Sequence, residues 1–253
     1  MKRFTFAAVI LLVLSGFSVA QDKKAAQLRW FGHSYFVLVT STGTRVAFDP
    51  HAISEYGAPM IAPDMVLISH NHNDHNRKEI FSNADSKDLL VFNGLVTKGK
   101  NTDWVKIDEK VKNVRVRNVG TFHDNEEGAK RGKNSVMIVE ADGVVYCHLG
   151  DLGHELTDEQ IKAIGPVDVL MVPVGGIYTI NGEVAKKVVS QLNPKMYILP
   201  MHYGTKVNED LNPPDEFLDG QKNVLHLETK TNILDIPLGT KGDKSRVVML
   251  GWK

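Results

Sequence analysis

The chain has 253 residues, of which 42% are hydrophobic and 24% charged, a composition typical of a soluble globular protein. Its 30 Lys and Arg residues balance its 30 Asp and Glu residues, and this neutral total argues against a broad nucleic-acid-binding surface. We therefore expect no nucleic-acid partner. The single cysteine, Cys147, excludes an internal disulfide, so the core and any bound metal must stabilise the fold.

The first twenty residues have the pattern of a secretory signal. Lys2 and Arg3 form a basic start, residues 4–17 are mostly apolar, and small residues at 18–20 predict cleavage before Gln21. The apolar run is shorter than the roughly 20 residues that a membrane span needs, so no stable span is expected after cleavage. The pattern predicts an exported, periplasmic protein, with retention of the segment as an anchor as the alternative.

The first half of the mature chain predicts short strands. Residues 27–31, 35–40 and 44–48 are apolar or β-branched runs separated by turns, as in a β-meander. Residues 64–69 form a nearly continuous apolar run that suits a strand buried on both faces. This strand leads directly into the polar loop HNHNDHN, and a short helix is expected near residues 77–83.

The second half begins with strands and then alternates helices with strands. Asp142-Gly143 predicts a hairpin between two apolar runs, and Thr157 with Gln160 predicts the capped start of a helix. The expected strands are residues 114–119, 135–140, 144–148, 168–172, 196–199, 224–227 and 246–250, and the expected helices are residues 158–164 and 182–192, with a weaker helix or loop after Pro214. This order favours two sheets with helices outside them, in one domain spanning residues 22–253.

Four potential metal ligands lie within six residues at the end of the buried strand: His70, His72, Asp74 and His75. In an extended segment His70 and His72 project to the same side, so both can bind one ion, while Asp74 and His75 turn toward a second position. Imidazole and carboxylate together suit zinc, and manganese or iron are also compatible with these ligand types. The alternative is a solvated loop that is rich in histidine without a function.

Three further potential metal ligands, His123, Asp151 and His202, each follow a predicted strand downstream. The H-x-H-x-D-H segment and the order of these later motifs resemble the metallo-β-lactamase superfamily. Ahead of them, Ala47-Phe48-Asp49-Pro50 resembles the first motif of that family. The resemblance covers essentially the whole mature chain.

The resemblance implies an α+β fold, the αββα sandwich, in which two mixed β-sheets are flanked by helices and the site lies at one edge. It implies one metal site formed by His70, His72 and His123. It implies a second metal site formed by Asp74, His75 and His202. Asp151 would bridge two zinc ions, and Asp49 would orient a ligand or loop by hydrogen bonds.

This ligand set predicts a zinc-dependent hydrolase that acts on a small-molecule substrate. Two metal ions lower the pKa of a bound water from about 15.7 to roughly 7, so that hydroxide attacks a carbonyl or phosphoryl centre. Asp74 is expected to orient that water or take its proton. Fold alone does not select among esters, lactones and phosphodiesters, and the native metal and oligomeric state are not predicted.

The GHS, HLGDLGH and PVGGIYTI segments are similar to the bacterial branch related to ascorbate-6-phosphate lactonase. Asp151 at the bridging position disfavours a true β-lactamase. A redox di-iron enzyme of the same fold is disfavoured because that group carries Glu where this chain has His72. A non-catalytic metal-binding protein of the cell envelope is the alternative function, since its ligands would be the same.

Several other residues have roles that the sequence leaves open. His33, His154, Tyr178 and Tyr203 could each contact substrate or serve only in packing. His148 is expected on a strand and pointing away from the metals, with a ligand role as the alternative. His51 and His226 are expected to be structural, and Cys147 to be a small buried apolar residue.

Overall fold

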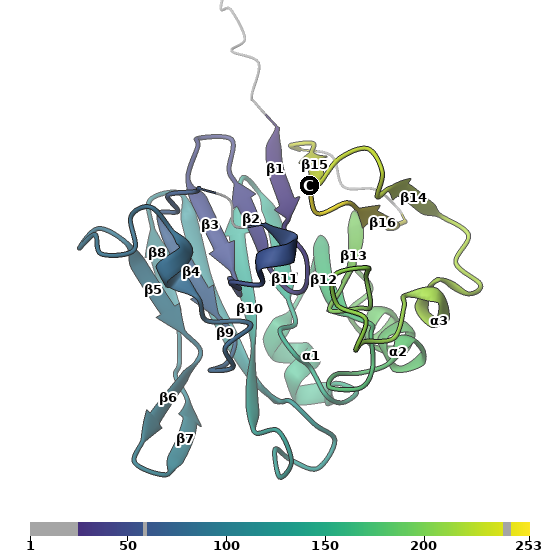
Figure 1. The fold of residues 1–253 in the computed structure, drawn as a ribbon, viewed down its shortest axis with the longest axis horizontal. Coiled ribbons are helices and arrows are strands. Elements are labelled where there is room, and N and C mark those ends of the chain that lie inside the picture. The colour runs from purple at the N-terminus through teal and green to yellow at the C-terminus, as the bar shows by residue number, and fades with distance from the viewer. Residues whose placement is uncertain (1–24, 58–59, 240–243) are drawn as a thin grey trace, which may run out of the picture.

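The computed structural model describes residues 25–57, 60–239 and 244–253, so the expected signal peptide at residues 1–20 lies outside the described residues. Two β-sheets face each other across a shared core (Figure 1). Within these described ranges, no helix combines the length and apolar content needed to cross a bilayer.

The first sheet has six strands in the order β15-β1-β2-β3-β4-β5. The first three strands of the chain pair antiparallel as the predicted meander, and β3, β4 and β5 then pair parallel. The strand bounds are β1 (Ala26–Trp30), β2 (Phe36–Val39), β3 (Arg45–Phe48), β4 (Met65–Ile68), β5 (Leu90–Asn93) and β15 (Ile233–Ile236).

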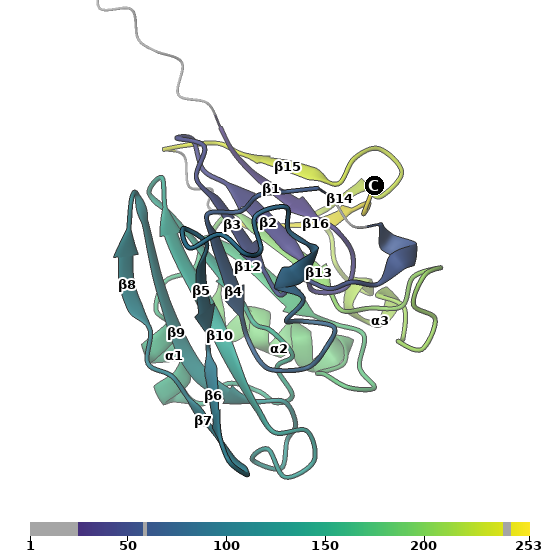
Figure 2. The same ribbon diagram turned by 60° about the vertical axis from the view of Figure 1, so that its left-hand side comes forward.

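The second sheet has eight strands in the order β14-β16-β13-β12-β11-β10-β9-β8. Its strands are β8 (Asp108–Val111), β9 (Val114–Phe122), β10 (Lys133–Ala141), β11 (Val144–His148), β12 (Val169–Pro173), β13 (Tyr197–Met201), β14 (Val224–Leu227) and β16 (Arg246–Leu250). The helices α1 (Asp158–Ile164) and α2 (Gly182–Leu192) pack against β9 and β12 (Figure 2). The predicted cap of α1 is confirmed, because Thr157 and Gln160 form a reciprocal capping box.

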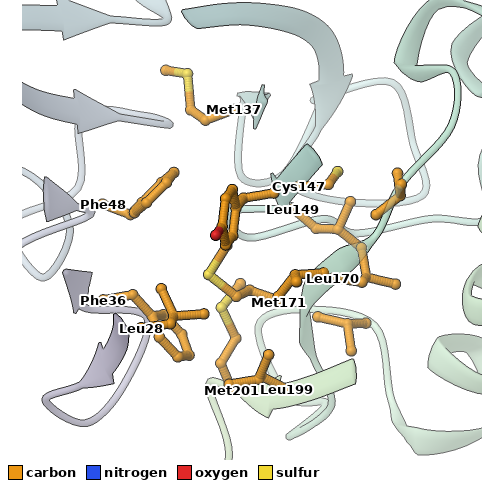
Figure 3. Close-up of a cluster of buried hydrophobic side chains, with 14 of the residues drawn as sticks. Leu28, Phe36, Phe48, Met137, Cys147, Leu149, Leu170, Met171, Leu199 and Met201 are labelled. Atoms are coloured by element: carbon orange, nitrogen blue, oxygen red, sulfur yellow. The ribbon is translucent and has the colours of Figure 1, made fainter. Parts of the chain in front are cut away.

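The main core fills the space between the sheets. Figure 3 shows Phe36 and Phe48 of the first sheet facing Met171 and Met201 of the second. Along β4, Met65 and Leu67 face this core, whereas Val66 and Ile68 face the opposite side, as the two-residue period of a strand requires. The buried run predicted at residues 64–69 is therefore covered on both faces.

The outer face of the first sheet is covered by less structure than the outer face of the second sheet, where α1 and α2 pack. Val66 and Ile68 pack there against Phe81 and Leu89. The helix expected near residues 77–83 is only a three-residue 3₁₀ helix, η2 (Lys78–Ile80), and η1 (Ser54–Tyr56) is equally short. The αββα sandwich is confirmed, with this outer layer made of loops and single turns.

Five strands were not predicted from the sequence. The hairpin of β6 (Leu95–Lys98) and β7 (Asn101–Trp104) and the edge strand β8 are largely polar and exposed. Strand β5 is short, and β15 forms by pairing with β1, which lies some 200 residues earlier in the chain. The short helix α3 (Asp215–Leu218) lies where a helix or loop was expected after Pro214. Apolar periodicity is weak in such segments, so tertiary pairing decides their conformation.

Candidate metal centre

Asp49 fixes the start of the histidine-rich loop. It follows β3, is 1% exposed, and accepts hydrogen bonds from the backbone N–H (2.7 Å) and the hydroxyl (2.6 Å) of Ser69. It also lies 2.9 Å from Nδ1 of His75. Because a carboxylate only accepts, Nδ1 of His75 carries a proton, which leaves Nε2 as the nitrogen that can bind a metal. Burial would lower the pKa of His75, but the charges of Asp151 and Asp49 outweigh it and raise that pKa well above its usual value, so a metal would displace a proton from Nε2. The orienting role expected for Asp49 agrees with this geometry.

Ser69 determines in a similar way which ring nitrogen of His70 carries the proton. The hydroxyl of Ser69 uses its hydrogen on Asp49, so it accepts from Nδ1 of His70 at 2.8 Å. Nε2 of His70 therefore carries a lone pair, and it lies 3.0 Å from Nδ1 of His72. Burial first, and then the nearby His75, lower the pKa of His70 well below its usual value, so the imidazole is neutral.

Asp151 follows β11 in a tight turn held by Asn134 of β10. The side chain of Asn134 accepts a hydrogen bond from the N–H of Asp151 (3.0 Å) and donates to the carbonyl of Leu149 (2.9 Å). Gly150 has φ of +55°, and a Cβ there would lie 2.4 Å from Oδ1 of Asn134. Only glycine fits this approach, and the turn directs Asp151 toward the histidines.

Four histidines converge on one oxygen of Asp151. Oδ2 lies 3.1 Å from Nε2 of His123, 3.2 Å from that of His75, 3.2 Å from that of His202 and 3.7 Å from that of His70. These histidines come from the ends of β4, β9 and β13, and all four are buried. The carboxylate is thus at the centre of the cluster, where a bridging ligand was predicted.

The donor atoms form three groups, each within 4.8 Å of one another. One combines His70 and His75 with Asp49, whose oxygens already accept hydrogen bonds from Ser69. Two other groups remain. One group contains His70, His72 and His123. The other contains His33, Asp74, His75 and His202. All seven residues predicted as ligands are brought together, and His33, whose role the sequence left open, joins the second group.

His33 contacts Asp74 directly. Its Nε2 lies 3.1 Å from Oδ2 of Asp74. Burial first, and then His202, lower the pKa of His33 to about 3. Burial would raise the pKa of Asp74, but the hydrogen bond from His33 and the charge of His75 outweigh it and hold that pKa well below its usual range. His33 therefore keeps Asp74 ionised and in place.

The donor set fits divalent cations. Oδ1 of Asp151 is buried and has no hydrogen-bond partner among the described residues. Buried polar atoms are rarely left unpaired, and an imidazole lone pair and a carboxylate oxygen are metal ligands. The excess of imidazole over carboxylate donors suits zinc and iron better than magnesium or calcium.

Other candidate residues have structural roles. Both ring nitrogens of His148 are engaged, one 2.8 Å from the Ser34 carbonyl and the other accepting the N–H of Gly150, so His148 is not a reserve ligand. Tyr203 is buried against Trp30, with ring centroids 5.4 Å apart, and is a packing residue. The remaining ones are His51 bonded to the Phe31 carbonyl, exposed His226 paired with Glu228, and buried Cys147. His154 accepts the Phe122 N–H and also lines a groove beside the ligand cluster, so its contact with substrate stays a prediction.

A cavity of about 190 Å³ opens onto the ligand cluster. Its lining residues are His72, Asp74, His123, Arg131, Asp151, Tyr178 and His202. A larger groove of about 680 Å³ shares His123, Arg131 and Tyr178 with it. Sequence reasoning did not find Arg131, because nothing in its local pattern sets it apart from the other basic residues of a polar loop.

Comparisons with known proteins agree with the fold and the cluster. A family model described as the beta-lactamase superfamily domain matches residues 27–202. A UPF0173 metal-dependent hydrolase from Thermococcus onnurineus is 30% identical over 197 residues, covering 71% of this chain and 85% of that protein. One from Caldivirga maquilingensis is 30% identical over 207 residues, covering 75% and 87%.

A solved structure is also similar along nearly its whole length. It is a protein of the metallo-β-lactamase superfamily from Thermotoga maritima, described as a Zn-dependent hydrolase. It is 34% identical, with a TM-score of 0.66, and the match covers 89% of this chain and 98% of that one.

Proposed function

The chain belongs to the metallo-β-lactamase superfamily and is a metal-dependent hydrolase, and from this premise we propose that it binds two zinc ions and hydrolyses a small ester, lactone or phosphodiester. The observation that carries the proposal is the convergence of four histidine Nε2 atoms on Oδ2 of Asp151, within 3.1–3.7 Å. A carboxylate surrounded by imidazole nitrogens is the arrangement that a pair of cations with a shared ligand needs.

Each zinc ion would be held by one half of the cluster. His70, His72 and His123 would hold one ion. Asp74, His75 and His202 would hold the other, and Asp151 would bind both. When bound, such ions lower the pKa of a coordinated water and polarise the carbonyl or phosphoryl oxygen of the substrate.

Asp74 is the residue of the cluster best placed to orient a water. Its side chain is 45% exposed and lines the cavity, whereas Asp151 is 3% exposed. The contact with His33 fixes one of its oxygens, and its lowered pKa keeps it ionised at neutral pH. Asp74 can therefore accept a hydrogen bond from an attacking water and orient it, and a serine or cysteine nucleophile is not needed.

The open cavity favours catalysis over a purely structural metal site. Structural zinc sites are closed by four protein ligands, whereas catalytic sites keep a position open to water or substrate. Here the ligands His72, Asp74 and His202 line a cavity that adjoins a groove large enough for a small organic molecule. A non-catalytic metal site does not require a cavity of this kind next to its ligands.

The proposal is tested by hydrolysis of a panel of chromogenic esters, lactones and phosphodiesters. We expect turnover of at least one panel member, loss of that turnover on chelation, and its return when zinc is added. His70→Ala should lose metal and nearly all turnover, whereas the control His226→Ala, at an exposed histidine paired with Glu228, should keep both. Undiminished turnover by His70→Ala would contradict the ligand assignment. Tightly bound metal without any turnover would favour the non-catalytic role.

A further inference from the structure

Arg131 lies on the boundary between the two spaces that a substrate could occupy. Its side chain lines the cavity of about 190 Å³ with the ligands Asp74, Asp151 and His202, and it also lines the groove of about 680 Å³. With His123 and Tyr178, Arg131 is one of the three residues that line both spaces.

The backbone around Arg131 is held rigidly. The carboxylate of Asp124 accepts the N–H groups of Arg131 (2.7 Å), Lys130 (2.9 Å), Gly128 (2.8 Å) and Glu126 (2.8 Å). Asp124 directly follows the ligand His123, so the loop that carries Arg131 is fixed to the metal centre itself.

The guanidinium is fixed from the opposite side by the loop after β12. It donates to the carbonyl of Ile177 at 3.0 Å, and its central carbon lies 5.4 Å from the ring centroid of Tyr178. Ile177 has φ of +58°, which is rare for a β-branched residue, and this conformation sets the direction of its carbonyl. These two contacts place the guanidinium beside the cavity that opens onto the ligand cluster.

The charge of Arg131 is not neutralised within the part of the chain that the structure describes. Its guanidinium forms no ion pair with a described carboxylate, in contrast to Arg115, which pairs with Asp108. The acidic groups of the groove have other partners, since Asp124 accepts backbone N–H groups and Glu155 pairs with Lys187 at 2.7 Å. Most of the N–H donors of Arg131 therefore remain available for a ligand.

We propose that Arg131 binds an anionic group of the substrate, a carboxylate or a phosphate, and so selects acidic esters or lactones over neutral ones. A planar guanidinium held beside a reaction centre binds such groups with two parallel hydrogen bonds. This inference rests on the proposed hydrolase function and adds the charge of the substrate to it.

The test compares two esters that differ only in charge: para-nitrophenyl valerate, and the para-nitrophenyl half-ester of glutaric acid, which has a carboxylate in place of the terminal methyl. The quantity measured is the ratio of kcat/KM for the acidic over the neutral ester, on zinc-loaded protein and corrected for spontaneous hydrolysis. We expect a ratio of about 10 to 100 for the wild type, the size of one charge-assisted contact.

Variants assign the preference to this side chain. Arg131→Gln should bring the ratio close to unity, and Arg131→Lys should keep part of it. The matched control is Lys130→Gln, because Lys130 is exposed, pairs with Glu126 and lines neither space. A wild-type ratio near unity, or an unchanged ratio in Arg131→Gln, would overturn the inference while leaving the hydrolase intact.

If the wild type hydrolyses neither ester, the ester chemistry of the proposed function fails, and binding decides the inference separately. Glutarate is then titrated calorimetrically into zinc-loaded wild type and Arg131→Gln. At least about 10-fold weaker binding to the variant supports the anion subsite. Equal affinity overturns it.

Discussion

A single hydrogen-bonded chain, from Asp49 through Ser69 to His70, decides which ring nitrogen of His70 can bind a metal. Asp49 acts in the same way on His75, so one buried carboxylate orients a ligand in each half of the cluster. Neighbours of this kind raise metal affinity without touching the metal. The sequence predicted an orienting role for Asp49 from its motif, but the role of Ser69 depends on side-chain geometry that spacing does not specify.

Ser69→Ala tests this chain. The substitution removes the acceptor of the His70 Nδ1 proton and one donor to Asp49, so we expect zinc affinity to fall by about 10- to 100-fold. Affinity is measured by competition with a chromogenic chelator. Ser54→Ala is the control, because Ser54 is exposed and its hydroxyl donates to neighbouring Glu55. Equal zinc affinity in Ser69→Ala and wild type would exclude the proposed role of Ser69.

The metal ligands could be anticipated from the sequence, whereas Arg131 could not. Four ligands lie in one hexapeptide, and His123, Asp151 and His202 each follow a recognisable strand, so local pattern and order were sufficient. The position of Arg131 depends on the folding of its loop around Asp124 and on a contact with Ile177, 46 residues away. Contacts of that kind arise only in the folded chain.

At the scale of elements, the ends of buried strands position the site. β4, β9, β11 and β13 were all predicted, because β4, β11 and β13 are apolar runs and β9 begins with alternating valines, and each strand ends close to a ligand. The polar hairpin β6–β7 and the edge strands β5, β8 and β15 were missed, but they contribute no ligand. Sequence reasoning was therefore most accurate where the function lies.

Asn134 joins the elements that carry the site. Its side chain bonds to Thr121 Oγ1 at the end of β9, to the Leu149 carbonyl after β11 and to the N–H of Asp151. We expect Asn134→Ala to lower the free energy of unfolding by about 2–4 kcal/mol, since three buried hydrogen bonds are lost. Denaturant unfolding measures this loss.

The control is Asn223→Ala, an exposed residue bonded to Ser245 and Arg246, which should change stability by less than about 0.5–1 kcal/mol. If both variants lose the same free energy, Asn134 does not have the structural role described here.

At the scale of the whole molecule, bound metal should stabilise the fold. Both sheets contribute ligands, and a ligand that binds only the native state at about 100 times its Kd adds roughly 2.7 kcal/mol. We therefore expect chelation to lower Tm by about 5–10 °C, as measured by calorimetry. An unchanged Tm after complete removal of metal would show that the sheets do not depend on it.

Cys147 provides a second measure of the same stability. It lies in the core on β11, and burial raises the pKa of its thiol to about 12. Native protein should react with thiol reagents only as fast as it opens, and chelated protein should react faster. Complete labelling in guanidinium chloride is the control. Rapid labelling of the native, metal-loaded protein would contradict the burial of this residue.

Export of the chain is a separate proposal that rests on residues 1–20. Expression of the full sequence in a bacterium should yield a periplasmic protein whose mass corresponds to a start at Gln21. A full-length protein retained with the membrane would indicate an uncleaved anchor instead.

The measurement that tests the central claim most directly is the metal content of the purified mature protein, determined by mass spectrometry. The ligand cluster around Asp151 predicts about two zinc ions per chain, because histidines from two separate donor groups contact its carboxylate. One ion or none, after purification without chelators and with zinc supplied, would contradict the two-metal site.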